Sequence, residues 1–365
     1  MKTLCLGIET SCDDTSLCLL EHENGTSSIL SFKTFSQETI LREWGGVVPE
    51  IASRNHLEKL LPLLKQVFED AQRSIDELKL ISVTTHPGLL GPLLTGLNMA
   101  KTLALFTKAS IVPANHLMAH LEAIGLTQGY NSYPYLGVLV SGGHTLFAKV
   151  TGPLEMEILG TTLDDAAGEA FDKGGKLLGL GYPAGRIIDL LAGYGNKEAI
   201  SFPIGLKDKK TANLSYSGVK TQLRNYLEKN PELILTPDQR DLILKDPSVA
   251  SQEFKDVCAS YQHAIVNAII LKLKMAFELN DLKELPIVVG GGVACNRYLR
   301  IRLKENFKNV SVVEPKYCTD NGAMIAHYGC LLQELAIPFP KCLGLDARDR
   351  IISKKGEKEN QLVLN

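Results

Sequence analysis

Residues 6–19 have the sequence Leu-Gly-Ile-Glu-Thr-Ser-Cys-Asp-Asp-Thr-Ser-Leu-Cys-Leu, which predicts a strand, a small polar turn and a second strand. Residues 139–147, Leu-Val-Ser-Gly-Gly-His-Thr-Leu-Phe, repeat this plan. Tight turns rich in Ser, Thr, Gly and Asp can grip a phosphate through backbone N–H groups and hydroxyls. The chain therefore carries the same strand-turn-strand unit in two separate places.

A third glycine-rich turn occurs in Val288-Val-Gly-Gly-Gly-Val-Ala-Cys-Asn296, where a buried strand is expected to run into a helix. Glycines let a base or ribose lie against the backbone, and a helix N-terminus favours an anion. Each glycine turn alone is more often a plain tight turn than a ligand site. Together, the three predict an α/β protein with the two-lobed actin/Hsp70/sugar-kinase architecture (the ASKHA, RNase H-like fold), with a nucleotide cleft between the lobes.

The remaining pattern supports an α/β protein with partly parallel sheets, because helical patterns separate many of the apolar runs. The expected strands are 3–8, 17–21, 80–84, 135–140, 146–150, 287–289 and 310–313. The expected helices are 49–71, 95–107, 169–178, 217–227, 249–279, 296–307 and 319–335.

The length of 365 residues and the hydrophobic content of 45% are enough for two core-bearing domains. We expect a first lobe over 1–112, completed by about 318–346, and a second lobe over 113–317 that contains the metal and nucleotide motifs. The polar stretch 207–256 is expected to be a helical insertion, and 347–365 a loose tail.

Charge and cysteine usage exclude several classes of protein. With 39 basic and 41 acidic residues the net charge is −2, so an RNA partner needs a local patch or a helper subunit. The eight cysteines form no C-x-x-C pair, which favours free thiols in a reducing compartment. No signal sequence or membrane-spanning apolar run is apparent, so we expect a soluble protein of the cytoplasm that makes no membrane contact.

Two histidines, His116 and His120, are four residues apart, which places both imidazoles on one face of a helix. Such a pair can bind one transition metal ion, and the alternative is a solvated pair of surface histidines. The residues between them are Leu-Met-Ala, so the glutamate that serves as general base in the His-Glu-x-x-His zinc proteases is missing. A metal here suits a Lewis acid better than a water-activating hydrolase.

These motifs resemble the universal tRNA threonylcarbamoyl transferases of the bacterial TsaD type, a family once described as O-sialoglycoprotein endopeptidases. The resemblance runs from Gly7 to about Ala326 in eight ordered blocks. The blocks are Gly-Ile-Glu-Thr-Ser-Cys-Asp (7–13), Gly-Gly-Val-Val-Pro-Glu (45–50), Pro-Gly-Leu (87–89), the histidine pair, Leu-Val-Ser-Gly-Gly-His-Thr (139–145), Asp-Asp-Ala-Ala-Gly-Glu-Ala-Phe-Asp-Lys (164–173), Gly-Gly-Val-Ala-Cys-Asn-Arg (291–297) and Thr-Asp-Asn-Gly-Ala-Met (319–324). Ala184, where the family usually has Gly, is a departure.

The resemblance implies a metal ion, iron or zinc, held by His116, His120 and Asp320 and bridging the lobes. Taken alone, Asp320 could equally be an ordinary N-cap at the start of a helix. The resemblance also implies a substrate site for the donor adenylate, with ribose contacts from Asp172. The residues expected there are Leu139, Val140, Ser141, Gly142, Gly143, Asp172, Gly185 and Asn296.

Glu9, Ser11 and Asp13 line the first predicted turn and are the candidate catalytic residues, with Asp14 a weaker candidate. Carboxylates near a metal could orient an amine or accept its proton, whereas Asp and Ser in such turns can also be simple turn formers. The implied reaction transfers a threonylcarbamoyl group from L-threonylcarbamoyl-AMP to N6 of the adenosine next to the anticodon, in tRNAs that read A-starting codons.

The implied partners are tRNA, an inactive paralogue of the same fold (TsaB type) and a small P-loop ATPase (TsaE type). Residues 49–71 form an amphipathic pattern that could pair with the paralogue or pack on its own sheet. Two basic stretches could contact RNA, although a run of charges is usually a solvated face. They are Lys207, Lys209, Lys210, Lys220 and Arg224, and Arg297, Arg300, Arg302 and Lys304.

Two other functions share this fold. A small-molecule kinase would need Mg²⁺, which prefers oxygen ligands to a histidine pair. An inactive nucleotide-binding scaffold would have no need for a complete set of metal ligands. The residues alone leave open the metal, the oligomeric state, the RNA-binding face and the need for a general base.

Overall fold

The computed structural model of the chain describes residues 2–129, 132–282, 285–348 and 361–363. The chain divides into two compact units. The first unit consists of residues 1–133, 150–156 and 313–365, and the second of residues 134–149 and 157–312. Most of the expected tail, 349–360 and 364–365, lies outside the described residues.

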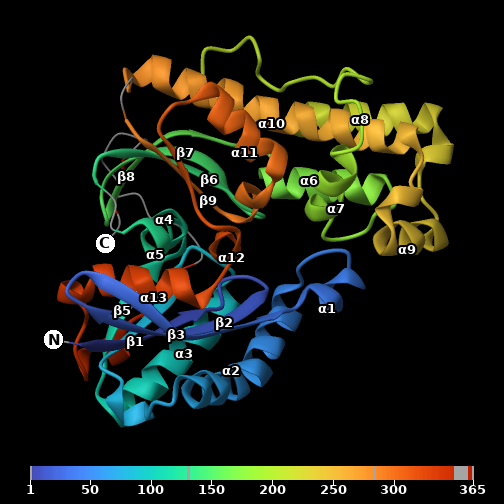
Figure 1. The fold of residues 1–365 in the computed structure, drawn as a ribbon. Coiled ribbons are helices and arrows are strands. Elements are labelled where there is room, and N and C mark those ends of the chain that lie inside the picture. The colour runs from blue at the N-terminus through green and yellow to red at the C-terminus, as the bar shows by residue number, and fades with distance from the viewer. Residues whose placement is uncertain (1, 130–131, 283–284, 349–360, 364–365) are drawn as a thin grey trace. The chain divides into compact units, whose positions relative to one another are not determined.

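The first unit is built on a five-stranded sheet with the order β3-β2-β1-β4-β5. Strands β1 and β2 form an antiparallel hairpin, whereas β4 runs parallel to both β1 and β5. Helix α13 packs on β1, β2 and β4, and α2 and α3 pack together against β2, β3 and β4 (Figure 1). The bounds are β1 (Thr3–Glu9), β2 (Asp14–Glu23), β3 (Thr26–Ser36), α1 (Glu38–Arg42), α2 (Pro49–Ala71), β4 (Leu80–His86), α3 (Leu90–Thr107), β5 (Ser110–Asn115), α4 (His116–Glu122), α5 (Gly125–Gln128), α12 (Pro315–Cys318) and α13 (Gly322–Leu331).

The second unit contains most of a six-stranded sheet, in which β6 runs parallel to β9 and β9 parallel to β10. The long helix α10 packs against α7 and α11, and α6 packs against α7 and α8 (Figure 1). The bounds are β6 (Tyr135–Val140), β7 (Thr145–Gly152), β8 (Glu155–Thr161), α6 (Ala167–Leu177), α7 (Gly185–Ala192), α8 (Ser217–Lys229), α9 (Pro237–Lys245), α10 (Gln252–Asn280), β9 (Ile287–Gly290), α11 (Arg297–Asn306) and β10 (Val310–Val312). The short strand β11 (Gln361–Val363) belongs to the first unit.

The mixed parallel and antiparallel sheets confirm the α/β prediction. The strand-turn-strand pattern is present twice, as β1–β2 and as the neighbouring strands β6 and β7. The boundary expected at residue 113 differs from the unit boundary, because β5 and α4 belong to the first unit, where α4 packs on α13. The histidine pair therefore lies in the first unit.

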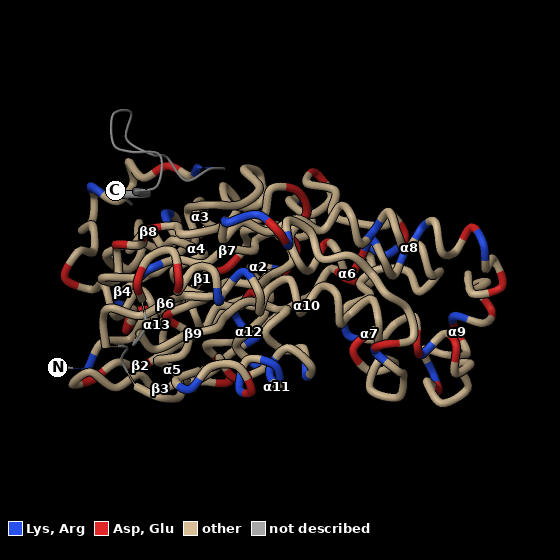
Figure 2. The backbone as a smooth tube through the Cα atoms, turned by 90° about the horizontal axis from the view of Figure 1, so that it is seen from above, with Lys and Arg blue, Asp and Glu red and all other residues tan. Residues whose placement is uncertain are grey.

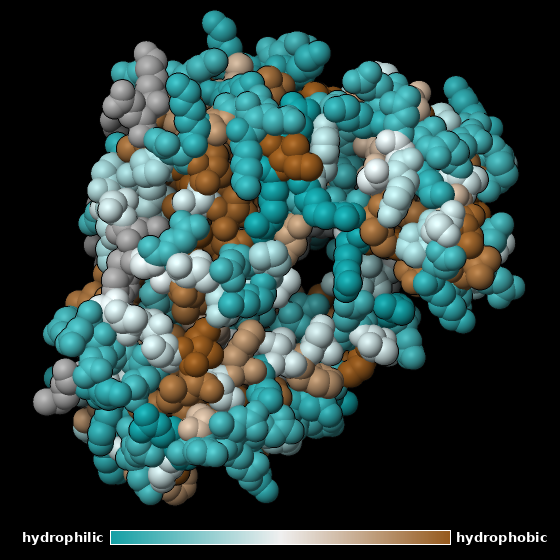
Figure 3. All heavy atoms as spheres, in the orientation of Figure 1, coloured by the Kyte–Doolittle hydropathy of each residue, from teal (hydrophilic) through white to brown (hydrophobic). Residues whose placement is uncertain are grey.

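Buried apolar side chains from β1, β2, α2, β4 and α3 form the core of the first unit. In Figure 3, hydrophilic residues cover most of the visible face, with smaller hydrophobic groups between them. None of the helices in the described residues combines the length and apolar content needed to cross a membrane.

The buried His327 on α13 makes the stability of the first unit sensitive to acid. Burial lowers the pKa of His327 from 6.5 to about 4, with a smaller contribution from His22. Below pH 6.5 the unfolded chain binds a proton that the folded chain does not bind until about pH 4, so stability falls across this window. The loss from His327 is on the order of 3 kcal/mol. Urea unfolding at pH 7 and pH 4.5 checks this, and His327→Gln should make the dependence less steep. Part of the dependence should remain, because burial also lowers the pKa of His86 to about 4.

Candidate metal centre and nucleotide-binding turns

The carboxyl ends of three parallel strands meet at one edge of the first sheet. Strand β1 ends at Glu9, β4 at His86 and β5 at Asn115, and β4 is parallel to the other two. Side chains that follow these strands therefore gather at this edge, where ligand sites form in open α/β sheets. His116 comes directly after β5, and Ser11 follows β1.

Helix α4 begins at His116 because Asn115 caps it, its Oδ1 accepting a hydrogen bond from the Met118 backbone N–H at 3.0 Å. Every residue of α4 is buried. The predicted helical spacing of His116 and His120 is therefore confirmed, but the pair lies in the interior, so the solvated-pair interpretation is wrong.

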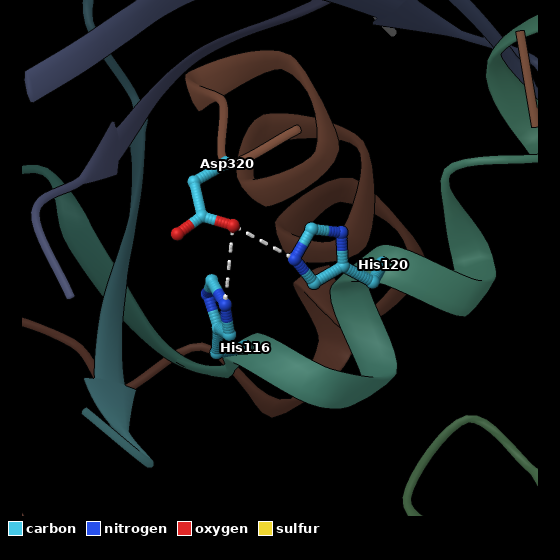
Figure 4. Close-up of side chains that lie close together, drawn as sticks. All are labelled: His116, His120 and Asp320. Carbon is cyan, nitrogen blue, oxygen red and sulfur yellow. Dashed lines mark hydrogen bonds and ion pairs between the residues drawn. The ribbon is translucent and has the colours of Figure 1, made fainter. Parts of the chain in front are cut away.

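Asp320 lies between α12 and α13 and faces both histidines (Figure 4). Its Oδ1 atom is 3.0 Å from Nε2 of His120 and 3.5 Å from Nε2 of His116. The N-cap of α13 is Asn321, whose Oδ1 accepts a hydrogen bond from the Met324 N–H. Asp320 therefore does not cap this helix.

The three side chains fit a metal ion. One ligand atom from each lies within 4.8 Å of the others. Two ligands bound about 2.0–2.2 Å from one tetrahedral ion lie ~3.4 Å apart, close to the separations of Asp320 from the two histidines. Two imidazoles and one carboxylate are donors that zinc and ferrous iron both accept.

Contacts behind His116 fix the direction of its ring. Its Nδ1 atom lies 3.1 Å from Oε2 of Glu9 and 3.2 Å from Oγ of Ser11, which leaves Nε2 facing Asp320. Glu9 is fully buried and also accepts from the Thr84 hydroxyl at 2.6 Å and the Ser11 N–H at 2.6 Å. A carboxylate behind a ligand histidine is the usual outer contact of a metal site. Glu9 and Ser11 therefore fix the orientation of the His116 ring.

Electrostatics at this edge favour a bound cation. Burial alone would lower the pKa of His116, but the carboxylates of Asp320 and Glu9 raise this pKa to about 9. Burial, together with Asp13 and Asp320, raises the pKa of Asp14 to about 8. A ligand histidine must be deprotonated, so a metal ion bound here would displace the proton of His116 at neutral pH.

His56 on α2 holds the turn that contains Asp13. Its Nδ1 lies 2.7 Å from the Thr15 hydroxyl, and its Nε2 lies 3.1 Å from the Cys12 carbonyl oxygen. Burial lowers the pKa of His56, which favours the neutral ring with Nε2–H donating to Cys12. Sequence reasoning missed both His56 and Thr84, because their partners are distant in the chain.

The second unit contains the predicted nucleotide-binding turns at the carboxyl ends of the parallel strands β6 and β9. Leu139 and Val140 are buried at the end of β6, and Leu139 is paired with Gly290. Gly291 has φ +93°, and a Cβ there would lie 2.5 Å from the Val140 carbonyl oxygen, so only glycine fits.

The turn after β6 is tied to the start of α6. The Ser141 N–H donates to the His144 carbonyl, and the Ser141 carbonyl accepts from the Gly168 N–H. Gly142 and Gly143 are exposed at the tip. This arrangement leaves a glycine turn beside a helix N-terminus, which suits a phosphate.

The other predicted substrate residues hold neighbouring elements in place. Oδ1 of Asp172 accepts from the Ala184 N–H at 2.8 Å, just before Gly185 begins α7. The amide of Asn296 caps α11 through Leu299 N–H and donates to Oε1 of Gln262 at 2.6 Å. The Asp172 carboxylate thus ties α6 to the start of α7, and Asn296 ties the start of α11 to α10.

An ion pair that sequence reasoning missed links α7 to α11. The Asp189 carboxylate accepts from the backbone N–H and the Nε of Arg297, at 3.2 Å and 3.0 Å. Arg302 is paired with Glu305, and Lys220 with Asp165. The two predicted basic stretches are thus partly neutralised, although α11 still carries a row of basic residues (Figure 2).

Comparisons with known proteins give a family match that covers most of the chain. Residues 28–327 match the family model described as "TsaD: tRNA N6-adenosine threonylcarbamoyltransferase". A curated protein of that name from Desulfovibrio desulfuricans is 43% identical over 334 residues, covering 90% of each chain. Another from Thermosipho melanesiensis is 41% identical, covering 89% of this chain and 93% of the relative.

Solved structures show the fold alone. The (R)-2-hydroxyglutaryl-CoA dehydratase component A of Acidaminococcus fermentans gives a TM-score of 0.51 at 14% identity, covering 91% of this chain and 96% of that one. The activator of the 2-hydroxyisocaproyl-CoA dehydratase from Clostridium difficile gives 0.50 at 13% identity, covering 91% and 95%. These likenesses confirm the predicted ASKHA fold class.

Proposed function

The chain belongs to the TsaD family of tRNA N6-adenosine threonylcarbamoyltransferases, and we propose that its transfer reaction depends on a metal ion held by His116, His120 and Asp320. The donor is L-threonylcarbamoyl-AMP, and the acceptor is N6 of the adenosine next to the anticodon in tRNAs that read A-starting codons. The products are N6-threonylcarbamoyladenosine and AMP. The single observation that carries the metal proposal is the convergence of three ligand atoms within 4.8 Å, with Glu9 behind His116.

The acceptor amine is a weak nucleophile, because the lone pair of this exocyclic nitrogen is delocalised into the adenine ring. In the transfer, N6 forms a bond to the carbamoyl carbon and loses one proton, the bond from that carbon to the phosphate oxygen breaks, and AMP leaves. Catalysis must therefore come from positioning and from stabilising charge on the carbonyl and phosphate oxygens. A divalent ion bound at the three ligands would supply a Lewis acid for such an oxygen.

Residues of the chain itself bind the donor, orient His116 and position the amine. The Ser141–Gly143 turn and the start of α6 bind the phosphate end of the donor, and Asp172 and Asn296 the ribose or base. Glu9 and Ser11 orient His116 and are positioning residues. Asp13, half-buried in the turn that His56 holds, orients the amine or accepts its proton.

Two alternatives are disfavoured. The relatives above carry the name of the transferase, which favours a transferase over an inactive scaffold or a small-molecule kinase. The complete set of ligand residues also argues against a scaffold, which would have no need for it.

Partner proteins are part of the proposal. The exposed face of α2 carries Leu57 and Leu61, which are 67% and 66% exposed, and Trp44 nearby in sequence is 62% exposed. Large exposed apolar groups on one element are typical of a pairing surface. We assign α2 to pairing with the inactive paralogue, and expect a small P-loop ATPase to complete the assembly.

The transferase assay tests the function directly. The chain, both partner proteins, threonylcarbamoyl-AMP and unmodified tRNA are incubated, and the nucleosides are read by mass spectrometry. Formation of N6-threonylcarbamoyladenosine supports the transferase. Absence of product with every component supplied, while the chain still binds AMP, would overturn it in favour of the scaffold.

Glu9→Gln should weaken metal binding while keeping the fold. The amide keeps the size of the side chain but removes the buried charge next to His116. Loss of such an outer contact typically costs about 10–100-fold in metal affinity. Titration with Fe²⁺ or Zn²⁺ should show this loss, and Glu23→Gln, on the exposed end of β2, should bind like wild type. Equal affinity for both variants would show that Glu9 has no such role.

A further inference from the structure

A cavity of about 270 Å³ lies in the second unit between α10 and the segment 197–204. Ile200, Phe202 and Ile204 give it an apolar side, while Lys197, His263 and Asn267 give it a polar side. Pockets for drug-sized ligands usually begin at about 300 Å³. The cavity is therefore suited to one small ring with a polar edge.

Hydrogen bonds hold the segment against α10. The Ile200 N–H donates to Oγ of Ser260 at 3.1 Å, and the Ser260 hydroxyl donates to the Asn196 carbonyl at 3.2 Å. The Asn196 N–H donates to the Asp256 carboxylate at 2.7 Å. The cavity is thus formed before any ligand binds.

A chain of hydrogen bonds beside the cavity ends on a tyrosine hydroxyl. Nε2 of His263 lies 2.7 Å from Nδ2 of Asn267, and Nδ1 lies 2.7 Å from the Tyr298 oxygen. Burial and the nearby Lys197 and Arg302 lower the pKa of His263, so its ring is neutral and Nδ1–H donates to Tyr298. Arg302 donates to the same oxygen at 3.0 Å. The Tyr298 O–H proton remains for another acceptor.

Two positively charged side chains lie near the Tyr298 ring. The Lys197 ammonium lies 5.7 Å from the ring centroid, and the Arg302 guanidinium carbon lies 5.8 Å from it. Arg297 and Arg302 are paired with Asp189 and Glu305, whereas Lys197 forms no ion pair with any residue that the structure describes. An unneutralised lysine beside an aromatic ring is a combination found where single-stranded nucleic acid binds.

The cavity is separate from the predicted donor-binding residues but shares α10 with them. Gln262, which accepts from Asn296, is adjacent in sequence to His263. Glu198, also at the cavity, disfavours a free phosphate ion inside it but can accept a hydrogen bond from the amino group of a base.

We propose that this cavity binds one unstacked nucleotide of the acceptor tRNA, other than the adenosine that is modified. The base enters beside Phe202 and His263, and its phosphate lies toward Lys197. This inference rests on the proposed function, because it takes tRNA as the acceptor. RNA is read mainly through unstacked bases and phosphate contacts, which these groups supply.

Two variants test the proposal, Tyr298→Leu and Lys197→Gln, each in the full chain with both partner proteins. Binding of unmodified tRNA is measured by fluorescence anisotropy over a range of salt concentrations. Tyr298→Leu removes the hydroxyl that holds His263 and the ring beside Lys197, and should raise the Kd for tRNA about tenfold. Lys197→Gln should raise Kd and lower the slope of log Kd against log salt by about 0.7. In the transfer assay, KM for tRNA should rise while KM for threonylcarbamoyl-AMP stays constant.

The control is Lys79→Gln, an exposed lysine in the first unit, which should match wild type. Unchanged Kd and slope in both test variants would overturn the proposal, and Lys197→Gln keeps the test valid if Tyr298→Leu folds poorly. Weaker binding of AMP by Tyr298→Leu, measured by calorimetry, would assign the cavity to a free mononucleotide and also overturn it. Because tRNA binding is read without turnover, failure of the cavity proposal is distinguishable from failure of the transferase assignment.

Discussion

Asp320→Ala should lower the rate of threonylcarbamoyl transfer by about 10²–10³-fold, the range seen when one stabilising group is removed from an active site. Oδ1 of Asp320 faces Nε2 of both His116 and His120, so this one substitution removes the group that the two histidines share. Two imidazoles alone form an incomplete ligand set. The rate is measured by mass spectrometry of tRNA nucleosides, and bound metal by elemental analysis.

The control for this variant is Asp76→Ala, which removes an exposed carboxylate from the same unit and should transfer at the wild-type rate. His116→Ala should behave like Asp320→Ala. Wild-type rates for both ligand variants would mean that the cluster is structural and would direct attention to Asp13.

Gly322→Ala should destabilise the first unit by about 1–3 kcal/mol and weaken metal binding at the same time. A Cβ on Gly322 would lie 2.7 Å from Cys18 N and from Leu17 C on β2, so α13 would have to move away from the sheet. Strand β1 and helix α13 also approach closely at Gly7, because a Cβ there would collide with the Gly322 carbonyl oxygen. Asp320 precedes this helix by two residues, and a shift of α13 would carry it away from His120.

Urea unfolding measures the stability of the Gly322→Ala variant, and metal titration measures its affinity. Gly344→Ala is the matched control, since a Cβ there meets nothing within 4 Å. If Gly322→Ala loses stability but binds metal normally, the close approach of α13 to the sheet does not position Asp320.

The sequence predicted elements best where burial makes the apolar pattern continuous. The expected strand 135–140 coincides with β6, whose residues are all buried. Strand β3 was missed because only one of its eleven residues is buried, so the pattern is too polar for a strand prediction. Strand β5 was missed because Pro113 argues against a strand, but β5 is an edge strand, where proline is tolerated.

In the candidate site, local features could likewise be predicted, whereas contacts between distant residues could not. Helical spacing was enough to predict that His116 and His120 share a face, and the family resemblance supplied Asp320. The contacts of Glu9 and Thr84 could not be predicted, because His116 is 107 residues from Glu9 in the chain. Only the parallel pairing of β1, β4 and β5 brings these side chains together.

The most direct test of the central claim is transfer by the wild-type assembly before and after removal of its metal. The chain is stripped with a chelator, reloaded with graded amounts of Fe²⁺ or Zn²⁺, and assayed with threonylcarbamoyl-AMP and unmodified tRNA. We predict that the rate of N6-threonylcarbamoyladenosine formation rises with metal content and reaches its maximum at one ion per chain. Transfer at the full rate by the stripped protein would contradict the account.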